Sequence, residues 1–242
     1  MKIPELKGYG KIGTGKYRLL NYIIDISELN GKGIKYIRSK NDLILADSLV
    51  IGSSDVVIVP IYPVLVPKKI TDYVLVELDR KIEIAPSAKT EFYIQIPVDI
   101  AVYAYRDKDF TIIDIIPGYK PKYALYGSPN EGVIARYMRT SIYNSEPTPE
   151  IGKAVALVRV RNKTRGWVTL TKILVHSNNL RLYYEEGSWK ACIQKLNVVV
   201  DSRSTASVTY EGITCTGVKP IDDPLGLKPP RIVYKTSMLW GI

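Results

Sequence analysis

Few residues in this 242-residue chain have the types and spacing that catalysis or metal binding requires. The single histidine, His176, ends the apolar run KILVH, and no G-x-S-x-G sequence precedes it to supply a nucleophile. Cys192 and Cys215 are the only cysteines, and two thiols with one histidine do not make an ordinary structural zinc site. We therefore predict no catalytic residue, no metal site and no cofactor. We expect two buried free thiols, with a disulfide as the alternative.

The glycine-rich stretch GYGKIGTGKYRLL, residues 8–20, fits G-x-G-x-x-G and the first seven positions of G-x-x-x-x-G-K-[ST]. A phosphate-binding loop of either kind follows a buried strand and opens a helix. Here the preceding segment is charged and contains Pro4. Tyr17 stands where the motif needs a serine or threonine hydroxyl to bind magnesium, and its long ring cannot reach back to do so. We predict instead a turn between two short strands, with Lys16 as a turn residue.

The composition is that of a globular protein with a strong positive charge. Hydrophobic residues make up 46% of the chain, the net charge is +10 and the pI is about 9.4, which favours polyanionic partners. No apolar run approaches the roughly 20 residues of a membrane helix, and the N-terminus lacks the apolar core of a secretory signal. We expect a cytoplasmic protein without a membrane span. The scarcity of thermolabile residues suggests a thermophile.

The elements that must position any site are predicted to be strands. Runs such as YIIDIS, GIKYIRS, DYVLVEL, FTIIDII and GVIARYM are rich in isoleucine and valine, and turn sequences such as NGKG (residues 30–33) separate them. The best helical candidate, residues 16–29, is ambiguous. Regular short strands indicate an all-β protein, which we interpret as two β-sandwich-like domains, the second immunoglobulin-like.

A domain boundary is predicted at NSEPTPEIG, residues 144–152, because two prolines and several polar residues are typical of a linker. Residues 1–145 would form an N-terminal β-rich domain and residues 150–216 an immunoglobulin-like sandwich. Residues 217–242 read as an extended proline-rich tail, whose apolar end (MLW) is expected to pack back on the body.

Several of these segments resemble an archaeal family known as domain of unknown function number 432. The segments are PIYPVLVP, IPVDIAVY, PKYALYG and GVIARY, in that order, followed by RNKTRGWVTLTKILV in the second half. The resemblance covers most of the chain and implies an archaeal source. It implies no activity, cofactor or catalytic residue.

Three charged residues, Arg38, Asp99 and Arg136, stand inside apolar strands. Period-two alternation places Arg136 with Ile134 and Met138, while Asp99 lies in an almost wholly apolar run. Buried charges are costly unless they are paired, so one interpretation is a structural ion pair. The other is a polar pocket lined by Arg38, Asp99, Tyr123, Tyr126, Arg136 and Tyr137.

A basic hairpin follows the predicted boundary. Alternation puts the arginines of KAVALVRVRN together on one strand face, and the KTRG turn adds further cations and an aromatic neighbour. Such a set can grip phosphates and stack on a base, although an ordinary solvated strand face has the same pattern. The candidate nucleic-acid patch comprises Arg159, Arg161, Lys163, Arg165 and Trp167.

Taken together, the sequence favours a non-catalytic binding or assembly protein that acts on a protein partner, with a homo-oligomer as one form of such assembly. The alternative is a nucleic-acid or ribonucleoprotein-binding protein that uses the basic hairpin. A second alternative is an enzyme acting on an anionic substrate near Arg136.

Overall fold

The fold is all-β, as predicted. The computed structural model describes residues 3–52, 54–67, 69–106, 109–177, 180–202 and 205–221, and the backbone of residues 236–239. These residues form four sheets, and no α-helix occurs among them. It follows that no described helix has the length and apolar character needed to cross a membrane.

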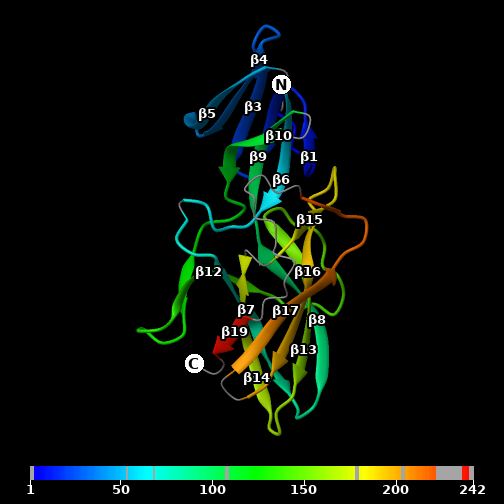
Figure 1. Ribbon diagram of the computed structural model, residues 1–242. Helices are drawn as coiled ribbons and strands as arrows, with labels where there is room; N and C mark the ends of the chain where they lie inside the picture. Colours follow the sequence, from blue (N-terminus) through cyan, green and yellow to red (C-terminus); the bar gives the residue numbers. More distant parts are fainter. Residues whose placement is uncertain are drawn as a thin grey trace.

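Two sheets form what we call the N-terminal sheet pair, in the upper part of Figure 1. The first is an antiparallel meander of β2 (Gly15–Leu19), β3 (Tyr22–Glu28), β4 (Gly33–Lys40) and β5 (Leu43–Ile51). The second has the order β1 (Gly10–Ile12), β6 (Asp55–Ile61), β9 (Asp99–Arg106) and β10 (Asp109–Ile116). The NGKG turn joins β3 to β4, with Asn30 and Gly31 at φ of 47° and 72°, a region that asparagine and glycine tolerate.

The other two sheets form the C-terminal sheet pair, in the lower part of Figure 1. One has the order β11 (Tyr123–Tyr126), β12 (Val133–Thr140), β7 (Tyr73–Ile84) and β14 (Val168–His176), with β12 parallel to β7. The other contains β18 (Lys219–Pro220), β15 (Leu182–Tyr184), β16 (Ala191–Val200), β13 (Lys153–Asn162) and β8 (Lys89–Pro97). Its β17 (Thr205–Ile213) pairs with β16 and with β19 (Thr236–Leu239), so the chain returns to the body near its C-terminus.

The two sheet pairs meet at a junction where one strand run changes sheets. Only Val98 separates β8, in the C-terminal sheet pair, from β9, in the N-terminal one. The amide of Val98 donates to the carbonyl of Gly152 at 2.9 Å. Gly152 has φ +77°, and a Cβ there would lie 2.6 Å from the carbonyl oxygen of Gly118, so glycine is required. One buried apolar cluster extends through both sheet pairs across this junction.

Three predictions about the first 30 residues have different outcomes. The glycine-rich stretch does form a turn between two short strands, β1 and β2. The helical interpretation of residues 16–29 is wrong, because this segment forms β2 and β3. Lys16 accordingly lies in a strand rather than a turn, where its ammonium contacts Asp25 at 3.1 Å. Cross-strand pairing overrides the local helical pattern here.

The expectation of free thiols is also wrong. Cys192 in β16 and Cys215, just beyond β17, form a disulfide with their Cα atoms 6.2 Å apart, within the usual range. Their pairing follows from the antiparallel β16–β17 hairpin, because the end of β17 lies beside the beginning of β16. The carboxylate of Glu146 lies within 4.8 Å of both sulfurs, but the disulfide leaves no thiolate there to bind a metal ion.

Candidate functional site

The six residues of the predicted polar pocket do not share one place. Arg38 lies in β4, in a sheet that contains none of the other five residues. Asp99 and Arg136 lie together at the junction, with Tyr123 beside them. Tyr126 is half-buried at the end of β11, and Tyr137 points elsewhere, donating to the Glu77 carboxylate at 3.2 Å. The single pocket therefore becomes two separate ion pairs.

The junction pair is completely buried. Nη2 of Arg136 lies 3.8 Å from Oδ1 of Asp99, and neither side chain has exposed surface. Nη1 of Arg136 donates to the carbonyl of Val66 at 3.3 Å, and its guanidinium carbon lies 5.1 Å from the ring centre of Tyr119 and 5.5 Å from that of Tyr123. Arg136 comes from β12 and Asp99 from β9, so the pair connects the two sheet pairs.

Hydrogen bonding at the junction pair is incomplete. Nε and Nη2 of Arg136, Oδ2 of Asp99 and the hydroxyl of Tyr123 are buried without a hydrogen-bond partner among the described residues. Burial raises the pKa of Asp99 to about 6, although the Gly118 amide, which donates at 3.1 Å, and the Arg136 charge both act to lower it. Burial likewise raises the pKa of Tyr119, whose hydroxyl donates to the Tyr137 carbonyl at 2.8 Å. The junction pair therefore keeps the Arg136 and Asp99 side chains away from solvent.

Arg38 forms a different and complete ion pair with Asp114 of β10. Nε and Nη2 of Arg38 donate to the two carboxylate oxygens at 2.6 and 3.0 Å, and the hydroxyl of Tyr36 donates to the same carboxylate at 2.7 Å. The side chains of Arg38 and Asp114 are only 11% and 7% exposed. This pair joins β4 to β10 and so fastens the two sheets of the N-terminal sheet pair together.

The histidine behaves as a strand-end residue, as predicted. His176 closes β14, and its ring packs edge-on against Tyr73 with centroids 4.8 Å apart. Burial lowers the pKa of His176, which favours the neutral ring. The described residues bring no nucleophile within hydrogen-bond distance of it.

The predicted basic hairpin is wrong as a hairpin, because its two strands, β13 and β14, lie in different sheets and pair with other strands. A turn joins them, and the basic residues of this segment differ in their partners. Arg159 contacts Glu91 at 3.1 Å and Lys163 contacts Asp201 at 3.5 Å. Arg161 and Arg165 are exposed and form no ion pair with any residue that the structure describes. Trp167 is 67% exposed. A groove of about 490 Å³ crosses the strand face that carries Arg159 and Arg161, and its lining also includes Lys89, Glu91, Asn197 and Val199.

A feature that the alternation pattern did not single out is the edge strand β5. It lies at the end of its sheet, with only β4 beside it. Five of its large apolar side chains are exposed, namely Leu43, Ile44, Leu45, Leu49 and Ile51, the last to 76%. The run DLILADSLV carried the signal, because it has too many leucines and isoleucines for a strand with one solvated face.

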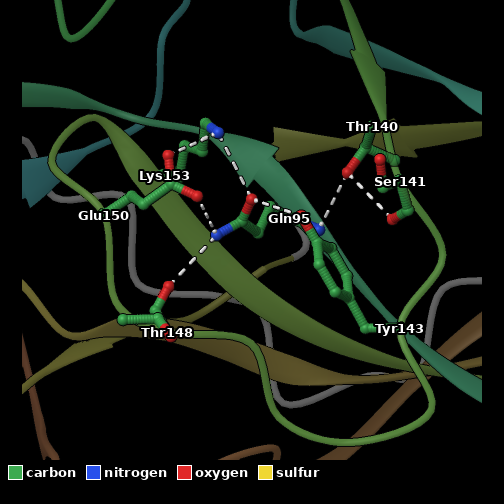
Figure 2. A network of polar contacts seen from close by, with 7 residues as sticks. All are labelled: Gln95, Thr140, Ser141, Tyr143, Thr148, Glu150 and Lys153. Carbon is green, nitrogen blue, oxygen red and sulfur yellow. Dashed lines mark hydrogen bonds and ion pairs between the residues drawn. The ribbon is translucent and has the colours of Figure 1, made fainter.

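The predicted linker is held in place by a buried polar network around Gln95 of β8 (Figure 2). The Gln95 amide nitrogen donates to the carbonyl of Thr148 and the carboxylate of Glu150 at 3.3 and 3.1 Å. Its oxygen accepts from Tyr143 and Lys153, both at 3.3 Å. The hydrogen bond from Lys153, at 2.7 Å, lowers the pKa of Glu150. Residues 144–152 therefore have fixed contacts with β8 and β13.

Comparison with known families gives one decisive result. Residues 8–239 match the family described as "Protein of unknown function (DUF432)". The chain belongs to this family. The resemblance noted from its short motifs is thus confirmed, and it now extends over almost the whole DUF432 chain. Comparisons with curated proteins and with solved structures gave no match.

Proposed function

We propose that this DUF432 protein is a non-catalytic assembly protein that binds a protein partner through the edge strand β5. The supporting observation is the exposure of five large apolar side chains on a strand that has only one neighbour. Soluble proteins rarely leave contiguous apolar surface in water, and an open strand edge offers unpaired N–H and C=O groups to another chain. A partner strand would satisfy both needs at once.

The charge on β5 also suits a specific contact. Asp47 is its one charged residue after the apolar start of the strand, and it contacts Lys35 of β4 at 3.8 Å. Leu45 and Leu49 flank Asp47 on the exposed strand face, since exposed and half-buried side chains alternate from Leu45 to Ile51. The mixture of one partly compensated charge with several apolar groups is typical of a protein interface rather than of a nucleic-acid surface.

The test is site-specific photo-crosslinking inside the organism's own cells. A photoreactive amino acid at Leu49 should give one discrete adduct, whose mass separates a second copy of this chain from a different protein. The adduct should disappear when Leu45→Lys is added, with little change in thermal midpoint because Leu45 is exposed.

The matched control is the β11–β12 hairpin, which projects from the body in Figure 1. Leu125 and Ile134 are directly opposite each other there and are also exposed. A crosslinker at Leu125 should not give the adduct. The same product from both positions, or no product from Leu49, would contradict an interface at β5.

We also propose that the N-terminal sheet pair is a β-sandwich. Contacts of Tyr36, Arg38 and Ser48 with β10 support a β-sandwich-like arrangement of the N-terminal sheet pair. The immunoglobulin-like assignment of residues 150–216 and the boundary near residue 145 stay predictions. Strands β7 and β8, from before that boundary, pair with β14 and β13 from beyond it.

A further inference from the structure

The groove on the outer face of β8, β13 and β16 has an uncompensated positive charge. In the β8–β13 register Lys89 lies directly opposite Arg161. Both side chains are exposed, and neither forms an ion pair with a described residue. Like charges in directly opposite positions destabilise a sheet unless an anion lies between them. The next pair along the same strands, Arg159 and Glu91, is by contrast neutralised at 3.1 Å.

The rest of this cross-strand row contains no acid. Arg161 is followed across the sheet by Val199 of β16, and Val199 by Ser207 of β17. Asn197, one position along on the same face, adds an amide that can donate to an oxygen. The groove therefore offers two free cations, a neutral donor and an apolar floor.

An exposed aromatic ring follows the turn after β13, beyond the residues that line the groove. The side-chain amide of Asn162, the residue after Arg161, donates to the carbonyl of Gly166 at 2.8 Å and to those of Ile84 and Ala85 at 3.1 and 3.0 Å. These bonds fix the turn whose next residue is Trp167. The tryptophan is thus both held at its base and open to solvent, which is the requirement for stacking on an unpaired base.

We propose that this groove binds single-stranded nucleic acid, with Lys89 and Arg161 on the phosphodiester backbone and Trp167 stacked on a base. The proposal is independent of the β5 interface, which lies in the other sheet pair. Single strands fit better than duplex because only they expose base faces to an aromatic side chain. The net charge of +10 strengthens the attraction over the whole surface.

The experiment measures fluorescence anisotropy of a labelled oligonucleotide of about 12 nucleotides, matched to the site sizes of single-strand binders, over a series of salt concentrations. The variant carrying Lys89→Gln and Arg161→Gln should lose about 1.4 units of log–log salt slope, since each phosphate contact on a single strand contributes roughly 0.7. Trp167→Ala should weaken binding about tenfold and leave the slope unchanged.

The control variant carries Lys7→Gln and Lys32→Gln. Both lysines are exposed, neither contacts the groove, and the change in net charge is the same. Its slope and thermal midpoint should equal those of the wild type, whereas the thermal midpoint of the Lys89→Gln, Arg161→Gln variant should be equal or higher, because two opposed like charges are removed. A slope that falls equally in both variants would show binding by overall charge and overturn the site. Absence of binding at low salt, or equal displacement by polyglutamate, would do so too, the latter assigning the groove to an acidic protein.

Discussion

The two arginine–aspartate pairs of this protein both place charges away from water, but they differ in how fully those charges are hydrogen-bonded. Arg38 and Asp114 share two hydrogen bonds, with a third from Tyr36, and retain a little contact with solvent. Arg136 and Asp99 are 3.8 Å apart, wholly buried, and leave several polar atoms without partners. The first pair holds two sheets of one sheet pair together, whereas the second connects the two sheet pairs. Complete hydrogen bonding, rather than burial alone, distinguishes an ion pair that stabilises the fold from one that only offsets the cost of burying its two charges.

Double-mutant cycles test this difference between the two ion pairs most directly. Arg136→Met leaves the Asp99 charge buried and unpaired, which should cost roughly 3–5 kcal/mol of unfolding free energy. Combining it with Asp99→Leu should cost much less than the sum of the single changes, because no charge then remains. Chemical denaturation measures each value.

The matched cycle uses Arg38→Met and Asp114→Leu. Here the double variant also loses three good hydrogen bonds and leaves Tyr36 without its acceptor, so it should recover less of the single-variant cost. Equal recovery in the two cycles would remove the distinction between the pairs. Small additive losses at the junction would show that Asp99 and Arg136 do not depend on each other.

The second prediction concerns pH. Burial raises the pKa of Asp99 from 3.8 to about 6, so the folded chain binds more protons than the unfolded chain between these values. The stability that this carboxyl contributes is therefore fully present below pH 3.8 and is lost as pH rises to about 6, a change of about 3 kcal/mol.

The measurement compares the wild type with Asp99→Asn, which has a similar shape but does not titrate. The difference in unfolding free energy between the two should change over pH 4–6 and be flat at higher pH. All other acids cancel in this difference. A difference that is flat throughout would mean that Asp99 titrates at its ordinary pKa.

The smallest effect is expected at the tyrosine hydroxyls. Tyr36→Phe removes the hydrogen bond to the charged Asp114 carboxylate and should cost about 1.5–3 kcal/mol. Tyr123→Phe removes a buried hydroxyl without a partner among the described residues, so the cost should be near zero or negative. Thermal unfolding of both variants makes the comparison. A larger loss for Tyr123→Phe would show that its hydroxyl makes a stabilising contact.

Most strands were predictable because isoleucine, valine and turn residues alternate along this chain. Strand β6, with the sequence DVVIVPI, was missed because it is a continuous apolar run that includes Pro60. The partner of Arg38 was missed for a geometric reason. The pairing of β10 with β9 shifts between Ile112 and Asp114, and that of β4 with β5 shifts at Arg38. Such irregularities redirect side chains, so period-two alternation fails where the ion pair forms.

The junction pair was predictable as charge in apolar strands, but its surroundings were not. Tyr119 and the carbonyl of Val66 come from loops, and no periodicity places a loop beside a particular strand. The disulfide was equally hidden, since two cysteines 23 residues apart have no local signature. Local pattern therefore predicted which segments pair, whereas long-range contacts decided what their side chains meet.

The strand run through Val98 has a consequence for synthesis on the ribosome. One partner of β9 is β6, which has already emerged when β9 does, whereas β8 must wait for β13, which begins at Lys153. At roughly 5–20 residues per second the wait lasts several seconds. During this time we expect Phe92, Ile94 and Ile96, which are buried in the folded protein, to lack the strand that pairs with β8. The order of synthesis therefore leads us to expect a nascent state in which an apolar strand waits for its partner, the type of state on which chaperones act.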